Sequence, residues 1–347
     1  MKKVYQVLGP EGFGAYEVNW TTGEWRRVVA APKSTLVPGF VDIHIHGAFG
    51  VDFMSATDQE MLQLCSQLSA EGYEAFLPTT VTASLESVQT ALKNLPEHPM
   101  IPGFHLEGPF ISPEYPGAQP TSAIVDPPVG KSAWDAVLSD QRLKVITLAP
   151  ERPHALALIS RLMKRGVVVS MGHTSATHEQ ARRGFEFGAA HTTHTFNAMR
   201  GLHHREAGIV GYALTNDAVS TELIYDRNHV CKEAAELLFQ CKPADKVIAV
   251  SDSTKATGLP PRQKLEMWGH KVVTAKNEVR LEKSGALAGS AITLLQAFKN
   301  LHEDFGPEVA IRACSLNPRA AIGLGEPKVY YQFDQNLEIV DRIVVKG

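Results

Sequence analysis

The sequence predicts an α/β protein in which a (β/α)8 TIM-like barrel carries a small β domain built from both chain ends. A short apolar run followed by a helical stretch recurs about eight times in the middle of the chain, and such alternation is typical of a parallel sheet. Segments with β-like composition lie at both ends. The 347 residues, 44% of them hydrophobic, suffice for one large domain and a small accessory one.

The small β domain is expected from residues 1–37 and 326–347. Short β-like pieces alternate there with glycine-rich turns. Neither end has enough strands to bury a core alone, so we expect the two ends to meet. The pieces are Val4–Leu8, Ala15–Trp20, Glu24–Ala31, Val329–Tyr331 and Ile339–Val345.

Residues 38–325 are expected to form the barrel. An open doubly wound sheet is the alternative, but it would be favoured by a glycine-rich dinucleotide fingerprint, and none follows the first strand. The predicted strands are Phe40–His46, Ala75–Thr80, Gly103–Glu107, Val145–Ala149, Val167–His173, Ala190–His194, Glu222–Tyr225 and Val247–Asp252. The helices between them include Asp58–Glu71, Ser84–Leu95, His154–Arg165, Thr177–Phe187 and Lys232–Cys241.

Composition limits the partners to small molecules and to further copies of the chain. The net charge is −3 and the basic residues are dispersed, so we expect neither nucleic acid nor a membrane surface as a partner. Gly9-Pro10-Glu11-Gly12 interrupts the first apolar run before a signal peptide can form, and no stretch has the length of a transmembrane helix. The four cysteines are far apart in sequence, as in a reduced, cytoplasmic protein.

The stretch Gly39–Gly47, GFVDIHIHG, contains the first candidate metal ligands. Residues two apart on a strand share a face, so His44 and His46 are expected to point the same way from the end of the first strand. Two adjacent imidazoles suit a divalent metal better than an apolar core.

Later strands end in further candidate ligands. Glu107 ends the third strand and can bind one metal or bridge two, while His173 and His194 end the fifth and sixth. Catalytic groups of a barrel lie at the carboxyl ends of its strands, so these residues are expected to converge. We interpret His191 as structural and His105 as a residue of the barrel interior.

Asp252 ends the eighth apolar run and is the candidate acid/base. A metal polarises a carbonyl and activates water, but a leaving amine still requires a proton. One carboxylate that takes a proton from water and passes it to the amine would meet both needs.

With H-x-H on strand one, Glu on strand three, His on strands five and six and Asp on strand eight, the chain resembles the amidohydrolase superfamily. Within it, the chain is similar to the N-acetylglucosamine-6-phosphate deacetylase family, in motifs that run from Pro38 to about Gly325. They are PGFVDIHIHG, FHLEGPF, SMGHTSAT, THTFNAM, AVSDST, LAGSAIT and NPRAAIGLG.

The resemblance implies hydrolysis of the acetamide of N-acetyl-D-glucosamine 6-phosphate to D-glucosamine 6-phosphate and acetate, in amino-sugar metabolism. It implies a metal held by Glu107, His173 and His194, with Asp252 as general acid/base. The intact His44 and His46 make a second metal site available, so one or two divalent ions are expected per subunit. Imidazole and carboxylate ligands suit several metals; zinc and iron are the leading choices.

The resemblance also implies how the amino-sugar phosphate is held. The sugar is expected to contact Asn197, Ala198, His229 and the backbone near Leu287. The phosphate is expected to bind Arg205, which in the family reaches the active site of the neighbouring subunit in a homodimer. A guanidinium matches two phosphate oxygens with its fork of donors.

Two departures from the family pattern affect the expected substrate contacts. Gln119 stands where the family usually has a histidine, so the donor near the acetyl carbonyl would be an amide. Arg227 stands where relatives have a glycine, and we interpret it as a surface residue in preference to an added phosphate contact.

Three other functions remain open at this point. One is deacetylation of a related sugar phosphate such as the galacto isomer. Another is the activity of a cyclic amidase or nucleobase deaminase, although such enzymes often carry a bridging lysine on strand four and Val145–Pro150 has none. The third is a catalytically idle scaffold, which a missing ligand would indicate; all candidate ligands are present.

Overall fold

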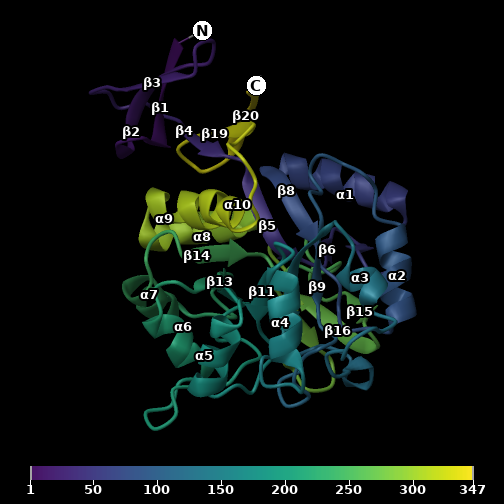
Figure 1. Ribbon diagram of the computed structural model, residues 1–347. Coiled ribbons are helices and arrows are strands. Elements are labelled where there is room, and N and C mark those ends of the chain that lie inside the picture. Colours follow the sequence, from purple (N-terminus) through teal and green to yellow (C-terminus); the bar gives the residue numbers. More distant parts are fainter. Residues whose placement is uncertain (1, 346–347) are drawn as a thin grey trace.

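The computed structural model describes residues 2–345 and has a mixed α/β fold with a curved parallel sheet (Figure 1). The outermost residues of the expected small domain, 1 and 346–347, lie outside the described residues. Helices surround the parallel strands, and both termini lie at one end of the molecule beside a separate sheet (Figure 1). Each of the eight expected barrel strands is present.

The parallel strands form two groups. Strands β5 and β8 pair with each other, and the other six lie in the order β14-β13-β12-β11-β10-β9. Their apolar side chains explain why they are central, since strands covered on both faces are hydrophobic throughout. The bounds are β5 (Phe40–Ile45), β8 (Tyr73–Pro78), β9 (Phe104–Glu107), β10 (Leu143–Leu148), β11 (Val168–Met171), β12 (His191–Thr192), β13 (Ser220–Ile224) and β14 (Val247–Val250).

The five expected helices are present: α1 (Asp58–Ala70), α2 (Leu85–Lys93), α4 (Ala155–Met163), α5 (His178–Glu186) and α7 (Lys232–Cys241). In α1, Thr57 and Glu60 form a capping box, and the buried face repeats at helical spacing. Further helical elements complete the layer: α3 (Asp135–Leu138), α6 (Gly208–Thr215), α8 (Leu294–Phe305), α9 (Pro307–Ile311), α10 (Asn317–Ala321), a 3-10 turn at Thr121–Ala123 and a π-helical turn at Arg312–Leu316.

A six-stranded sheet joins the two chain ends, in the order β20-β19-β4-β1-β2-β3. Tyr331 of this sheet donates from its hydroxyl to the carbonyls of Ser69 and Tyr73, at 2.9 and 3.0 Å. These hydrogen bonds connect the sheet to α1 and β8. Its strands are β1 (Lys2–Gly9), β2 (Gly12–Asn19), β3 (Glu24–Arg27), β4 (Thr35–Pro38), β19 (Val329–Phe333) and β20 (Ile339–Val344).

A four-stranded antiparallel sheet after β14 was not expected from the sequence. It consists of β15 (Lys264–Met267), β16 (His270–Ala275), β17 (Glu278–Leu281) and β18 (Leu287–Ser290). Trp268 and Gly269 turn β15 into β16, both with positive φ, as a tight hairpin with a right-handed twist requires. A shorter hairpin, β6 (Gly47–Ala48) with β7 (Val51–Asp52), follows β5 directly.

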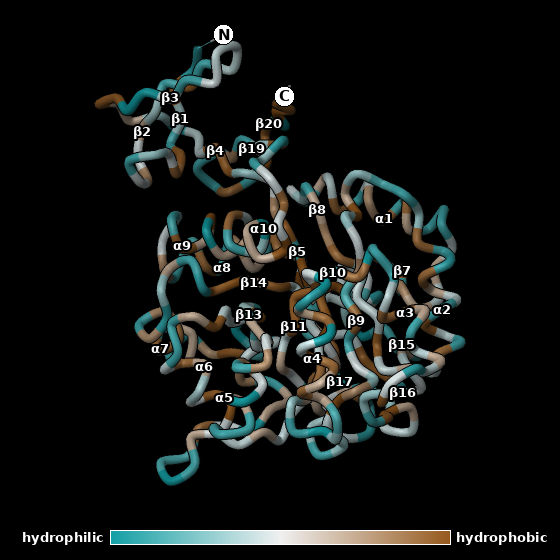
Figure 2. The backbone as a smooth tube through the Cα atoms, viewed as in Figure 1, coloured by the Kyte–Doolittle hydropathy of each residue, from teal (hydrophilic) through white to brown (hydrophobic). Residues whose placement is uncertain are grey.

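The core lies between the parallel strands and the helices, and Figure 2 shows hydrophobic stretches along β5 and β14. A separate buried hydrophobic cluster is formed by side chains of the parallel strands alone: Val41, Ile43, Ala75, Leu77, Val145, Ile224, Ile248 and Val250. Within residues 2–345, none of the helices combines the length and the apolar character needed to cross a bilayer.

Candidate active site

Six predicted residues converge at the carboxyl ends of the parallel strands. Each has at most 8% of its surface exposed. Parallel strands bring their carboxyl ends to one edge, so residues far apart in sequence meet there. The six are His44, His46, Glu107, His173, His194 and Asp252.

Glu107 is at the centre of this group. Its Oε1 lies 3.3, 3.1 and 3.3 Å from the Nε2 atoms of His44, His173 and His194, respectively. Its Oε2 lies 3.4 Å from Nε2 of His46. One carboxylate therefore touches all four imidazoles, as a bridging ligand would.

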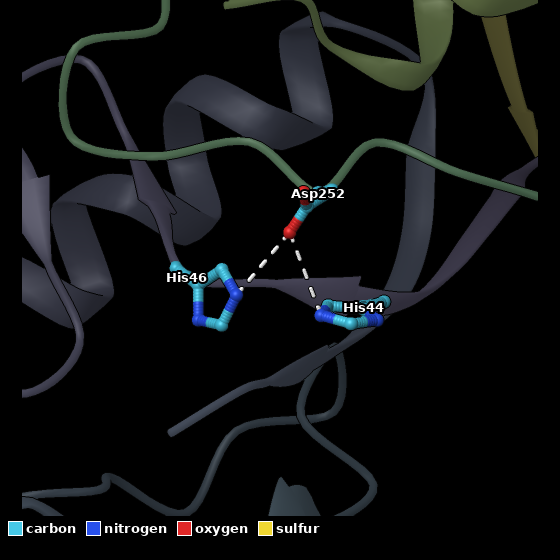
Figure 3. Close-up of side chains that lie close together, drawn as sticks. All are labelled: His44, His46 and Asp252. Atoms are coloured by element: carbon cyan, nitrogen blue, oxygen red, sulfur yellow. Dashed lines mark ion pairs between the residues drawn. The ribbon is translucent and has the colours of Figure 1, made fainter. Parts of the chain in front are cut away.

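Asp252 faces the H-x-H pair. Its Oδ1 lies 3.2 Å from Nε2 of His46 and 3.5 Å from Nε2 of His44 (Figure 3). Figure 3 shows both imidazoles directed at this carboxylate, as the alternation of side chains along a strand predicts. Two sets of three residues have ligand atoms within 4.8 Å of one another, His44/His46/Asp252 and His44/Glu107/His194.

The outer nitrogen of every imidazole in the group meets an acceptor. Carbonyl and carboxylate oxygens only accept hydrogen bonds, so each Nδ1 carries the proton and each Nε2 faces the centre. The Nδ1 contacts are His44 with Glu222 Oε2 at 3.2 Å, His46 with the Thr79 carbonyl at 3.1 Å, His173 with the Tyr115 carbonyl at 3.0 Å and His194 with the Asn197 carbonyl at 3.1 Å.

The inward nitrogens require a cation among them. The Nε2 atoms of His173 and His194 lie 3.1 Å apart, and two imidazole lone pairs repel each other at that distance. Nε2 of His44 has no hydrogen-bond partner. Protons or a divalent metal can supply the positive charge, and three imidazoles around carboxylates are a donor set that suits a metal.

The pKa shifts within the group also indicate that positive charge is favoured at its centre. Burial alone would lower the pKa of His46, but its contacts with Asp252 and Glu107 raise that pKa to about 9. Burial alone would raise the pKa of Asp252, but the hydrogen bond with His46 and the charge of His44 lower it to about 2. The Asp252 carboxylate is thus ionised at neutral pH, and the His46 imidazole attracts positive charge strongly.

Three of the six residues have a strained backbone. His173, His194 and Asp252 have φ values of 45°, 30° and 47°, in the left-handed region that residues other than glycine rarely adopt. Each follows the last residue of its strand by one or two positions. Such strain recurs at functional sites, where the surrounding structure imposes it.

A cavity of about 150 Å³ opens onto five of the six residues, with His44 buried behind them. The predicted substrate contacts Gln119, Asn197, Ala198, His229 and Leu287 all line it. His229 is held by Asp226, with 2.6 Å between Nδ1 and Oδ2. The structure therefore brings every predicted contact of this chain to one cavity, Arg205 excepted.

Arg205 lies on an exposed loop between β12 and α6 and is not among the cavity residues. Within residues 2–345, its guanidinium hydrogen-bonds to the neighbouring His204 ring alone, at 3.1 Å. Arg227 pairs with Glu303 and Asp304 of α8, at 2.8 and 2.6 Å, which agrees with its interpretation as a surface residue.

Gln119 is more constrained than the sequence indicates. Its Nε2 donates to Glu107 Oε2 at 2.5 Å, and its Oε1 accepts from the backbone N–H of Thr82 at 2.6 Å. The amide therefore holds the Glu107 carboxylate, and only its remaining N–H is available to a substrate.

Other residues of the site were not singled out from the sequence. Trp268 and Ala118 line the cavity, but Trp268 belongs to the unexpected antiparallel sheet. Glu222 is fully buried beside His44; a carboxylate within a predicted strand was the available indication. His105 is also buried, and its ring nitrogens contact the Ile43 carbonyl and Thr147, outside both ligand sets.

The chain is similar to known metal-dependent hydrolases. Residues 35–329 match the amidohydrolase family. The N-acetylglucosamine-6-phosphate deacetylase of Lysinibacillus sphaericus is 38% identical over 277 residues, which are 77% of this chain and 70% of the relative. The N-acetylgalactosamine-6-phosphate deacetylase of Escherichia coli O157:H7 is 35% identical over 298 residues, 83% of this chain and 78% of the relative.

A solved structure is also similar over nearly the whole chain. It is a mutant N-acetyl-D-glucosamine-6-phosphate deacetylase from Mycobacterium smegmatis in complex with N-acetyl-D-glucosamine-6-phosphate. The TM-score is 0.86 at 28% identity, and the match covers 96% of this chain and 94% of the other.

Proposed function

This chain belongs to the amidohydrolase family, and from that premise we propose that it hydrolyses the acetamide of N-acetyl-D-glucosamine 6-phosphate to D-glucosamine 6-phosphate and acetate. The observation that carries the proposal is the convergence of four imidazole Nε2 atoms on two carboxylates, Glu107 and Asp252, that line one cavity. Relatives at 38% and 36% identity are named for this reaction.

Glu107, His173 and His194 are the proposed ligands of a first divalent metal, with His44, His46 and Asp252 available for a second. A divalent metal polarises the amide carbonyl and makes water a better nucleophile at neutral pH. The donor set of imidazoles and carboxylates suits zinc or iron, and those two remain the proposed ions.

Asp252 is the proposed general acid/base. Its ionised carboxylate lies at the cavity and can accept the proton of the attacking water. As the C–N bond breaks, the same carboxyl group returns that proton to the leaving amine, so the amino sugar departs as a neutral amine. Gln119 and the histidines contribute by holding Glu107 and by fixing the geometry around the reacting carbon.

The sugar is proposed to contact Asn197, Ala198, His229 and Leu287, which line the cavity. Arg205 is proposed to bind the phosphate in the neighbouring subunit of a homodimer, which is consistent with its exposure and its distance from the cavity lining of its own chain. The four free cysteines are compatible with a cytoplasmic location.

The proposed scaffold is a closed (β/α)8 barrel over residues 38–325 and a small β domain from 1–37 and 326–347. Two contacts support closure. A single parallel bridge joins Thr79 after β8 to His105 of β9, and the backbone N–H of Asp252 donates to the His44 carbonyl at 2.9 Å. These contacts lie at the two gaps between the groups of parallel strands.

The galacto isomer is the second candidate substrate. A relative at 35% identity is named N-acetylgalactosamine-6-phosphate deacetylase. The two sugars differ only in the configuration of one hydroxyl, so the same metal centre and acid/base group would serve either.

Acetate release from the metal-loaded enzyme tests the proposal. We expect the largest kcat/KM for N-acetyl-D-glucosamine 6-phosphate, a lower value for the galacto isomer, and much weaker activity on unphosphorylated N-acetyl-D-glucosamine. Chelation should remove the activity and zinc or ferrous ion should restore it. Absence of acetate release from both phosphorylated sugars would refute the proposed function.

A further inference from the structure

Glu222 is a fully buried carboxylate that the proposed reaction does not use. It lies in β13 between Thr221 and Leu223 and has no exposed surface. Its ion-pair partner among residues 2–345 is the His44 imidazole, and its Oε1 has no hydrogen-bond partner in the described structure. Burying a carboxylate without a basic side chain is unfavourable unless it makes essential contacts.

The contacts of Glu222 are made to two candidate metal ligands. Its Oε2 lies 3.2 Å from Nδ1 of His44 and accepts from the backbone N–H of His194, also at 3.2 Å. The same oxygen thus touches the H-x-H strand and the strand end that carries His194. His44 belongs to both sets of potential ligands, so its orientation affects the whole centre.

Neighbouring rings confine His44 but do not choose between its two nitrogens. The His105 and His194 rings pack against it at centroid distances of 4.7 and 5.3 Å. An imidazole can rotate by half a turn within such contacts while keeping its shape. Only an acceptor beside Nδ1 fixes both the ring and its tautomer, and Glu222 is that acceptor.

We propose that Glu222 is a positioning residue that directs Nε2 of His44 at the centre and thereby sets the affinity of the second metal site, His44/His46/Asp252. The inference rests on the proposed metal-dependent function and deepens it. Occupancy of the second site then depends on a residue that is not itself a ligand. The first site consists of Glu107, His173 and His194. The Glu222 side chain contacts none of their metal-binding atoms, so this site should be retained without it.

Zinc titration tests this without substrate. Metal-free protein is dialysed against buffered Zn²⁺, and the bound zinc per chain is measured for wild type, Glu222→Gln and Glu222→Met. We expect Glu222→Met, which has no acceptor, to weaken the second zinc by about ten- to a hundredfold and to retain the first. Glu222→Gln should lose less, because its amide oxygen can still accept from Nδ1.

A double-mutant cycle separates positioning from a general structural role. If Glu222 acts through His44, adding Glu222→Gln or Glu222→Met to His44→Ala should weaken the second zinc no further. Glu74→Gln is the matched control, since it removes another carboxylate of low exposure, paired with Arg319 outside the centre. Its zinc affinities should be unchanged even if its melting temperature falls.

Three results would overturn the proposal: a wild-type chain that takes up only one zinc, wild-type affinity for the second zinc in both Glu222 variants, or a double mutant clearly weaker than His44→Ala. If Glu222→Met fails to fold, the second-zinc affinities of Glu222→Gln and of its double mutant with His44→Ala still test the proposal. Acetate release is assayed separately, so an inactive wild type would refute the proposed reaction while the zinc result stands.

Discussion

At the residue scale, the chemistry of the site depends on which ring nitrogen of each histidine carries the proton. All four direct Nδ1 at acceptors and Nε2 at two ionised carboxylates. A neutral imidazole in that arrangement presents only a lone pair to the centre. The candidate ligands could be singled out from the sequence because each lies at or just after the end of a predicted strand. Glu222 was missed, and Gln119 was predicted as a substrate contact without its hydrogen bond to Glu107, because such contacts join segments far apart in the sequence.

The exchange Asp252→Asn should reduce kcat at least about a hundredfold while the first metal, held by Glu107, His173 and His194, is retained. The amide has nearly the same shape as the carboxylate but cannot carry the proton from water to amine. Steady-state kinetics and metal analysis of the same preparation provide the measurement. Asp245→Asn, at an exposed position before β14, is the control that should retain activity; a near-normal kcat for Asp252→Asn would exclude this role.

Removal of either first-site imidazole should cost metal and activity together. His173→Ala and His194→Ala each delete a ligand that lies within 3.3 Å of Glu107, whereas His44→Ala should cost less activity if one metal suffices. Metal per chain and kcat are measured for all three. His302→Ala, in α8 outside the site, should match wild type. Full metal stoichiometry in both His173→Ala and His194→Ala would mean that the first site is misplaced.

Buried His191 should make the protein less stable in acid. Burial lowers its pKa to about 4, so it stays neutral in the folded state while the unfolded chain binds a proton below about pH 6.5. Stability is therefore fully present above pH 6.5 and is lost as the pH falls toward 4, by up to about 3 kcal/mol. Urea unfolding of metal-free wild type and His191→Gln measures this, and equal pH dependence in both would contradict it.

At the element scale, the hairpin β6–β7 connects the H-x-H strand to the loop that carries Asp252. The backbone N–H of His46 donates to the Ser253 carbonyl, and the Ser253 hydroxyl donates to the Gly47 carbonyl, at 2.9 and 2.8 Å. Gly47 has a φ of 155°, and a Cβ there would lie 2.0 Å from the Val51 carbonyl oxygen. Only glycine permits this close approach.

Gly47→Ala should therefore destabilise the fold by at least about 3 kcal/mol and reduce metal content, because the clash is with backbone and displaces His46. Gly50→Ala is the matched control in the same hairpin: its φ is 89° but a Cβ would meet nothing within 4 Å. It should cost only about 1 to 2 kcal/mol, from the left-handed backbone. Urea midpoints and metal analysis distinguish the two, and equal effects would show that the Val51 contact is unimportant.

Elements differ in how well the sequence predicts them. Most of the eight parallel strands are largely apolar, so the pattern identifies them, whereas β12 is reduced to two polar residues, His191 and Thr192. The antiparallel sheet β15–β18 was missed because Lys264–Leu281 is rich in exposed charges and has few apolar residues on each strand. Its Trp268-Gly269 turn was the available indication, but it departs from the usual asparagine-glycine pattern.

At the scale of the whole molecule, contacts between residues far apart in the sequence join the two chain ends to each other and to the parallel strands. The meeting of the two chain ends was expected because neither could bury a core alone, and the six-stranded sheet contains strands from both. Phe333 from the C-terminal part packs against Phe40 of β5 and Phe298 of α8, with centroids 6.2 and 5.3 Å apart. Such pairs join this sheet to the strand that carries the H-x-H motif.

The last prediction concerns Arg205, whose loop extends from the body of the molecule between α5 and α6 (Figure 1). If Arg205 binds the phosphate of a substrate in the partner subunit, Arg205→Ala should raise KM for the 6-phosphate sugar about ten- to a hundredfold. The unphosphorylated analogue should be hardly affected, since it has no charge to lose. Equal losses on both substrates would make Arg205 a structural residue.

Mixed dimers test whether the site is shared between subunits. In a dimer of one Arg205→Ala chain and one Asp252→Asn chain, one site combines an intact Asp252 with the intact Arg205 of its partner, and the other site lacks both. If subunits exchange at random, half of the dimers in an equal mixture are of this kind, so about a quarter of the wild-type activity per dimer should return. If each arginine serves its own chain, every site lacks one of the two groups and mixing restores nothing.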